Sequence, residues 1–194
     1  MIYKISEAVE ILANGSLLCI GTDTLFALSC DATNQSAIDH LYKVKMRDRE
    51  KKLPVFFYSL DHIMEYCEIP EIALNLAKKF WPGKLTIVLN LKSTRLNMLG
   101  DTIAVRIPGC DEILEIIKRL NRPIIGTSAN ISGSKNLENL TEVESVFSGT
   151  DVAIFNNHRV ISGMQSTIIS ITGDVVHIIR EGAISSEEIF ASLD

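Results

Sequence analysis

The chain has 194 residues, of which 46% are hydrophobic and 22% are charged, and its formal net charge is −5 at pH 7. This length allows one domain with a substantial core, and the composition argues against intrinsic disorder. No apolar run approaches the roughly 20 residues that a membrane-spanning helix needs, and charged residues interrupt the apolar N-terminal stretch. We therefore expect a single cytoplasmic domain over residues 1–194 that has no membrane partner.

The first 91 residues alternate between helical and strand-like patterns. Residues 5–15 predict a helix that begins at an N-cap Ser6 and ends at Gly15. Two strand-like runs follow around a polar break at residues 21–24, and apolar positions at helical spacing then occupy residues 34–45. After these the pattern predicts a buried strand, two helices and another strand. They cover residues 53–58, 60–67, 70–80 and 85–91, in that order.

The second half of the chain continues the alternation and ends in a hairpin. A strand at residues 102–108 precedes an amphipathic helix at 111–120, and a capping box of Thr141 and Glu144 predicts a helix over 141–147. Strands at 166–171 and 175–180 flank a turn at 172–174, and a last helix starts near Ser185 with Glu188 three residues on. The order of the predicted helices and strands indicates an α/β protein with a twisted mixed sheet, flanking helices and an open concave cleft.

The four cysteines carry no sign of a metal site. Cys19, Cys30, Cys67 and Cys110 lie far apart and form no Cys-x-x-Cys pair, which argues against bound zinc. We expect reduced thiols in the core, because free cysteine is usually buried.

Charge is distributed unevenly along the chain. Residues 43–52, called the basic island below, hold six basic and two acidic side chains, so the rest of the chain is strongly acidic. A local basic segment is typical of a site for one anionic ligand. It is equally typical of a solvated helix end, because lysine and arginine favour the last turn of a helix.

Polar breaks follow several of the apolar runs, and three isolated arginines accompany them, one in the basic island and two at the ends of predicted strands. In open α/β sheets, ligands bind beyond strand ends, and arginine there can grip carboxylate or phosphate with paired hydrogen bonds. A lone arginine could equally pair with a surface acid, but three such arginines are harder to explain in that way. These features favour a cleft for an oxygen-rich, multiply anionic ligand. The breaks are residues 21–24, 126–133 and 163–167, and the arginines are Arg47, Arg106 and Arg180.

The sequence does not match the common nucleotide-binding and serine-hydrolase motifs. The glycines never form G-x-G-x-x-G, and residues 83–85 lack the serine or threonine that a phosphate-binding loop requires after its lysine. Residues 126–130 approach the G-x-S-x-G nucleophile elbow, but Asn130 replaces its last glycine. The four histidines show no pairing with a serine, so a serine hydrolase is disfavoured.

Seven segments together point to a known family. In chain order they are GTDTLFALSCDA, KMR, FWPGKLTIVL, IAVRIPG, PIIGTSANISG, QSTIIS and IIREGAIS. They resemble the YrdC-type threonylcarbamoyl-AMP synthases over about residues 5–186, and the early end of the sequence resembles the single-domain members. The resemblance implies that L-threonine, bicarbonate and ATP, with Mg²⁺ as cofactor of ATP, form threonylcarbamoyl-AMP and pyrophosphate. Partner proteins of a tRNA threonylcarbamoyl-transferase complex then modify the adenosine beside the anticodon.

The resemblance also assigns roles to residues of this chain. It implies catalytic roles for Lys45, Arg47 and Ser128. It implies that ATP is bound by Arg47, Lys51, Thr102, Asn130 and Arg180. It implies that threonine is bound by Thr22, Thr24, Arg106, Ser128 and Ser166, with Arg106 on the carboxylate and with no metal ligand in the protein.

This sequence departs from the family pattern at several positions. Gly21 stands where proline is usual, Phe26 and Ala27 replace Tyr-Gly, and Ser170 replaces an aspartate. A histidine common after the third strand has no counterpart, and Phe56 or Phe57 occupies that region. We expect a looser first loop and the loss of one substrate contact.

Two other functions fit parts of the pattern. A non-catalytic module that binds double-stranded RNA or tRNA would use the basic island, but the acidic balance and the lack of an aromatic stacking platform disfavour it as the main role. Brief tRNA contact is compatible with either role. A carbamoyl-transfer enzyme of the hydrogenase-maturation type would require a longer chain with zinc-binding cysteines.

Overall fold

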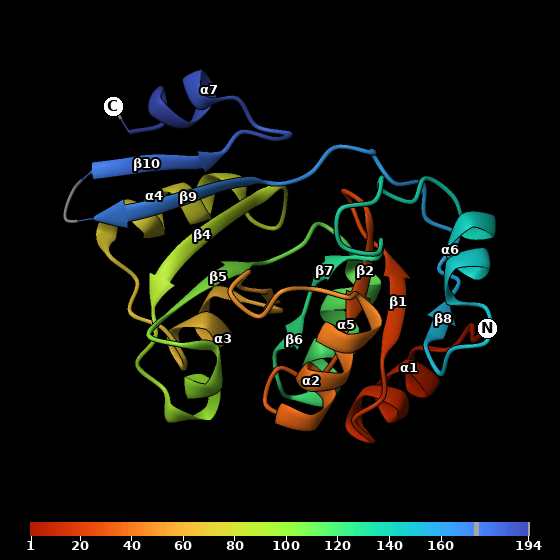
Figure 1. Ribbon diagram of the computed structural model, residues 1–194. Coiled ribbons are helices and arrows are strands. Elements are labelled where there is room, and N and C mark those ends of the chain that lie inside the picture. Colours follow the sequence, from red (N-terminus) through yellow and green to blue (C-terminus); the bar gives the residue numbers. More distant parts are fainter. Residues whose placement is uncertain (173–174, 194) are drawn as a thin grey trace.

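The computed structural model describes residues 1–172 and 175–193, and its strands form two sheets (Figure 1). The four-stranded sheet has the order β7-β2-β1-β8, in which only β1 and β8 pair in parallel. Its strands are β1 (Leu18–Gly21), β2 (Phe26–Ser29), β7 (Thr127–Ser128) and β8 (Ala153–Phe155). The α/β class and mixed pairing are confirmed, but the strands are divided between two sheets.

The six-stranded sheet has the order β10-β9-β4-β5-β3-β6. It is also mixed, because β3 pairs with β5 and β4 pairs with β9 in parallel while the other neighbours are antiparallel. Its strands are β3 (Pro54–Phe56), β4 (Leu85–Asn90), β5 (Thr102–Arg106), β6 (Ile124–Ile125), β9 (Thr167–Thr172) and β10 (Val175–Arg180).

Helices flank both sheets (Figure 1). Seven α-helices and one 3₁₀ helix are present in the described ranges: α1 (Ile5–Ala13), α2 (Gln35–Val44), α3 (Leu60–Met64), α4 (Glu71–Phe80), η1 (Thr94–Leu99), α5 (Asp111–Leu120), α6 (Leu140–Phe147) and α7 (Ser186–Phe190). Helix α5 buries Ile113, Ile116, Ile117 and Leu120, which share one face at the predicted helical spacing. This face packs with α1 against β1 and β2.

Side-chain alternation on β4 and β5 separates the core from a cavity. Leu85, Ile87 and Val105 point into the core that α3 and α4 cover. Their neighbours Thr86 and Ala104 line a cavity on the opposite face. The six-stranded sheet therefore has one packed face and one face available to a ligand.

The boundaries of two helices differ from the sequence prediction because other residues cap them. Helix α1 begins at Ile5 after Lys4, since the Glu7 carboxylate accepts a hydrogen bond from the Lys4 backbone N–H; Ser6 is inside the helix and is not its N-cap. Helix α6 begins at Leu140, because the Asn139 side chain accepts from the Glu142 N–H. The capping box predicted for Thr141 and Glu144 is therefore wrong.

Other details of the prediction are confirmed. Ser185 caps α7 by accepting from the Glu188 N–H. Strands β9 and β10 form an antiparallel pair, while the predicted turn at 172–174 includes residues that lie outside the described ranges. All four cysteines are free and buried. Across residues 1–172 and 175–193, no helix combines the length and apolar character required to cross a bilayer.

Gly126 is the point where the chain leaves one sheet for the other. It joins β6 of the six-stranded sheet to β7 of the four-stranded sheet. A Cβ atom at Gly126 would overlap the ring of Phe56, which is 2% exposed. Glycine is needed here because the backbone runs directly against a buried aromatic ring.

We expect Gly126→Ala to lower the free energy of unfolding by about 1–3 kcal/mol, because it overfills a packed site. Phe56→Leu removes the ring atoms that the new methyl group would meet. The double variant Gly126→Ala/Phe56→Leu should therefore lose less stability in urea unfolding than the sum of the two single losses. Additive losses would contradict this account of Gly126.

Candidate functional site

A cavity of about 400 Å³ lies between the two sheets and takes its walls from both. This volume falls within the range of small-molecule sites. The six-stranded sheet contributes an apolar wall and the four-stranded sheet contributes Phe26, Ala27, Thr127 and Ser128. The apolar wall consists of Val88, Ala104, Ile168 and Ile179, from four neighbouring strands.

The cavity brings together most of the residues that the sequence nominated. They come from chain segments more than 100 residues apart and meet on the walls of one hollow. These residues are Thr22, Thr24, Arg47, Thr102, Arg106, Ser128, Ser166 and Arg180. Lys45, Lys51 and Asn130 are not among the described residues that line it.

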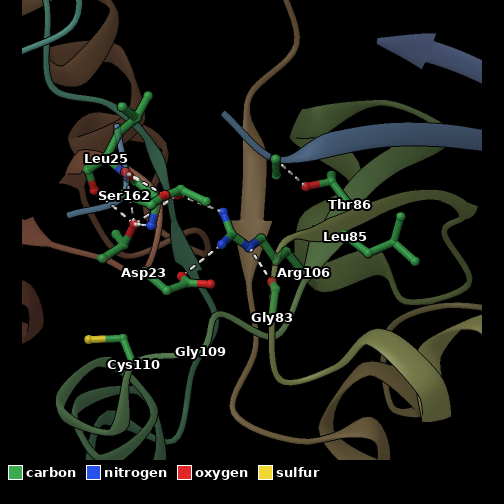
Figure 2. A network of polar contacts seen from close by, with 12 residues as sticks. Asp23, Leu25, Gly83, Leu85, Thr86, Arg106, Gly109, Cys110 and Ser162 are labelled. Carbon is green, nitrogen blue, oxygen red and sulfur yellow. Dashed lines mark hydrogen bonds and ion pairs between the residues drawn. The ribbon is translucent and has the colours of Figure 1, made fainter. Parts of the chain in front are cut away.

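Arg106, at the end of β5, is the most confined cation of the cavity (Figure 2). Its Nε donates to the Gly83 carbonyl over 2.7 Å, and its two terminal nitrogens donate to Thr24 Oγ1 over 3.0 Å and to Asp23 Oδ1 over 2.7 Å. Burial lowers the pKa of Arg106, and the neighbouring Asp23 carboxylate opposes that shift. The guanidinium is fixed in one orientation before any ligand binds.

The loop between β1 and β2 is closed by the Thr22 hydroxyl. This hydroxyl donates to the Leu25 carbonyl over 2.7 Å and accepts from the backbone N–H groups of Thr24 and Leu25. The hydroxyls of Thr22 and Thr24 are 2.9 Å apart. The Asn157 side chain donates to the Gly21 carbonyl over 2.9 Å, so the loop is supported from outside as well.

Lys45 holds the loop that follows β7. Its side chain is buried, and its ammonium donates to the carbonyls of Ser128 and Asn130, the second over 2.6 Å. The Ser128 hydroxyl donates to Asn130 Oδ1, and Asn130 Nδ2 donates to the Ser134 carbonyl, each over 2.6 Å. Lys45 and Asn130 therefore shape the loop, while Ser128 faces the cavity.

The basic island places Lys52 rather than Lys51 on the cavity wall. Arg47 bends back onto the island and donates to the carbonyls of Lys51 and Lys52, each over 3.0 Å. Lys52 Nζ donates to Thr102 Oγ1 over 3.0 Å. Lys51 is exposed and takes part in the turn through its backbone, since its carbonyl accepts from Arg47 and its N–H donates to the Asp48 carbonyl.

A third arginine, Arg180, closes the cavity from the hairpin. Arg180, in β10, donates to the Ser166 carbonyl over 2.8 Å, and the hydroxyls of Ser166 and Thr86 are 2.9 Å apart. Burial lowers the pKa of Arg180, and the positive charge of Arg106 lowers it further. Burial also lowers the pKa of Arg47. Three incompletely solvated guanidinium groups thus share one cavity, which an anionic ligand would stabilise.

Several residues of the site were missed by reasoning from sequence. Lys52 is one position from the nominated Lys51 in a run of basic residues, where spacing cannot distinguish the two. Thr86 lies within a segment whose pattern predicts an apolar strand. Asp23 lies between Thr22 and Thr24, and the family resemblance assigns threonine binding to these two residues and not to Asp23. Of the two candidate phenylalanines, Phe56 lines the cavity and Phe57 packs in the core against His62.

Comparison with known proteins finds similarity over most of the chain. A family model for Sua5, YciO and YrdC, described as telomere recombination, matches residues 10–182. A threonylcarbamoyl-AMP synthase of Pyrococcus abyssi is 32% identical over 191 residues, which are 96% of this chain and 56% of that protein. One from Aliivibrio fischeri is 31% identical over 158 residues, covering 78% of this chain and 85% of the relative.

Solved structures agree with the fold. The crystal structure of P. abyssi Sua5 complexed with L-threonine superposes with a TM-score of 0.90 at 31% identity, and it covers 97% of this chain and 56% of that one. Escherichia coli YciO superposes with a TM-score of 0.85 at 22% identity, covering 95% and 92%, which supports the fold alone. This chain spans little more than half the length of the P. abyssi protein.

Burial of Lys45 should appear in the pH dependence of stability. Burial, followed by the nearby charge of Arg47, lowers the pKa of Lys45 from 10.5 to about 8. Between these pH values the unfolded chain binds more protons than the folded protein, so the contribution of Lys45 to the free energy of unfolding increases with pH. The difference in unfolding free energy between wild type and Lys45→Met should therefore shift in favour of wild type from about pH 8 to pH 10.

Urea unfolding at a series of pH values measures this difference. Lys43→Met, at an exposed position of the same helix, is the matched control and should give a difference that does not change with pH. A flat profile for Lys45→Met as well would contradict the burial of a charged ammonium at this position.

Proposed function

Because this chain belongs to the Sua5/YciO/YrdC family, we propose that it makes threonylcarbamoyl-AMP and pyrophosphate from L-threonine, bicarbonate and ATP. The observation that carries the proposal is the convergence of Arg47, Arg106 and Arg180 on one cavity. The similarity to named threonylcarbamoyl-AMP synthases and to a Sua5 that binds L-threonine supports it.

The reaction joins two anions and needs no nucleophile from the protein. Threonine and bicarbonate condense with loss of water to N-carboxythreonine, and one carboxylate oxygen of this carbamate attacks the α-phosphorus of ATP. The bond from that phosphorus to the bridging oxygen breaks, and pyrophosphate leaves with the electron pair. Holding both reactants together lowers the barrier, and fixed cations offset the charge repulsion between them.

Arg106 is suited to the carboxylate of threonine. A guanidinium has five N–H groups, and three of those on Arg106 bond to partners within the described chain. The remaining two can donate to one carboxylate. Thr24, Ser128 and Ser166 place hydroxyl groups on the walls of the same cavity, where they can bind the polar groups of the amino acid.

Arg47, Lys52 and Arg180 are suited to the phosphates of ATP. They enter the cavity from the basic island and from β10, whereas Arg106 enters from the end of β5, although Arg106 and Arg180 are close enough for their charges to interact. We infer that Lys52 takes the role first assigned to Lys51, and that Thr102 helps to orient it. Lys45 and Asn130 act indirectly, because they hold the loop that presents Ser128.

Mg²⁺ fits this cavity as a companion of ATP. Among the described lining residues there is no aspartate or glutamate. Mg²⁺ prefers oxygen ligands and usually retains several waters, so phosphate oxygens and water would hold it. When bound, it neutralises phosphate charge, in addition to the charge that the arginines supply.

We also propose that the product passes to proteins of a tRNA threonylcarbamoyl-transferase complex in the cytoplasm. The exposed side chains of Lys43, Arg49 and Lys51 could support brief tRNA contact beside the cavity. A purely RNA-binding role would rely on such exposed charges and would not explain the buried hydrogen-bond network of Arg106.

The purified protein should release pyrophosphate when it is given ATP, Mg²⁺, bicarbonate and L-threonine. Release should cease when threonine is omitted, because the carbamate is the nucleophile. A coupled pyrophosphate assay measures both conditions. Equal release in the absence of threonine would refute the proposed reaction.

Arg106→Ala should raise the KM for threonine roughly 10- to 100-fold, because it removes charge-assisted hydrogen bonds to one carboxylate. Arg180→Ala should act mainly on the KM for ATP, since its guanidinium reaches the cavity from β10. Steady-state kinetics with each substrate varied in turn separates the two effects, and Arg119→Ala, at an exposed position of α5, is the control. An effect of Arg106→Ala on ATP alone would refute the carboxylate assignment.

A further inference from the structure

Asp23 makes a buried ion pair with Arg106 from outside the cavity. Its flanking residues Thr22 and Thr24 line the cavity, whereas Asp23 is not among the described lining residues. The side chains of Asp23 and Arg106 are 11% and 4% exposed, and Oδ1 of Asp23 accepts from a terminal nitrogen of Arg106 over 2.7 Å. In Figure 2 the carboxylate and the Gly83 carbonyl both lie below the guanidinium, the first to the left and the second to the right.

The backbone around Asp23 leaves its carboxylate little freedom. The Thr22 hydroxyl accepts from the N–H groups of Thr24 and Leu25, which fixes the turn that carries Asp23. On the far side, a Cβ atom at Gly109 would lie 3.1 Å from Asp23 Oδ2. The absence of a side chain at Gly109 therefore provides the space that the carboxylate occupies.

The ion pair also offsets part of the free-energy cost of burying the positive charge of Arg106 beside Arg180. Arg106 and Arg180 are close enough for the charge of the first to lower the pKa of the second, and burial disfavours the charge of both. Asp23 is the carboxylate that opposes this cost at Arg106. Removing one partner of a buried ion pair leaves an uncompensated charge and releases the other from its fixed geometry.

We propose that Asp23 is a positioning residue, which aims the two remaining N–H groups of Arg106 at the carboxylate of threonine. The inference rests on the proposed function and adds a residue that does not touch the substrate. Because Asp23 is not among the described residues that line the cavity, this role is favoured over direct contact with the amino group of threonine. The effect of Asp23 must therefore pass through Arg106.

The test compares Asp23→Asn and Asp23→Ala with wild type in the full chain. Asp23→Asn retains the size of the side chain and an acceptor oxygen but loses the charge, so it is expected to fold even if the alanine variant does not. We expect Asp23→Asn to weaken threonine binding roughly 10-fold, measured by calorimetry and as KM, while the KM for ATP changes by less than about 3-fold. Asp61→Asn, at an exposed carboxylate of α3, is the matched control.

A double-mutant cycle with Arg106→Ala tests whether Asp23 acts through Arg106. The double variant Asp23→Asn/Arg106→Ala should bind threonine no more weakly than Arg106→Ala alone, because the group that Asp23 positions is already absent. Fold-losses that multiply would overturn the positioning role, as would unchanged threonine affinity in Asp23→Asn. Melting temperatures of all variants show whether a loss of affinity reflects loss of folded protein.

Measuring threonine binding by calorimetry distinguishes failure of this inference from failure of the proposed reaction. Wild-type protein that binds threonine but releases no pyrophosphate would refute the reaction and leave the Asp23 comparison decisive. Wild-type protein that binds no threonine would overturn both.

Discussion

The buried ion pair between Arg106 and Asp23 joins the two sheets at the cavity on which the proposed function depends. Arg106 ends β5 of the six-stranded sheet, and Asp23 belongs to the loop between β1 and β2 of the four-stranded sheet. A third bond from Arg106 to Thr24 reaches the same loop. The position of one sheet relative to the other is thus linked directly to the orientation of the group that is suited to bind a carboxylate.

The cavity is organised before a ligand arrives. Lys45 fixes Ser128 at the end of β7 and the loop that follows, the Thr22 turn fixes Thr24, and the Ser166 carbonyl holds Arg180. Such preorganisation means that little ordering remains to be done on binding, while the incompletely solvated arginines gain from an anionic partner. Nucleotidyl transfer between two anions requires this combination of fixed geometry and positive charge.

Local sequence patterns predicted the seven α-helices of the described residues, most strands, and the arginines that end β5 and β10, but not the 3₁₀ helix η1. Helix α5 was predictable from the spacing of its apolar residues, because these residues share one face, which packs on α1 and β1. The division into two sheets was not predictable in this way, because the crossing at Gly126 depends on contact with the distant Phe56. The roles of Asp23 and Lys45 likewise depend on partners more than 80 residues away. Family resemblance named Lys45 but did not reveal that its ammonium faces loop carbonyls.

The account rests on one cavity that holds both reactants with separate cations. A crystal structure of the protein with threonylcarbamoyl-AMP tests this most directly. The threonyl carboxylate should lie within hydrogen-bond distance of Arg106, and the phosphate should lie on the side of Arg47 and Arg180. Density for the ligand on another surface, or with the carboxylate away from Arg106, would contradict the account.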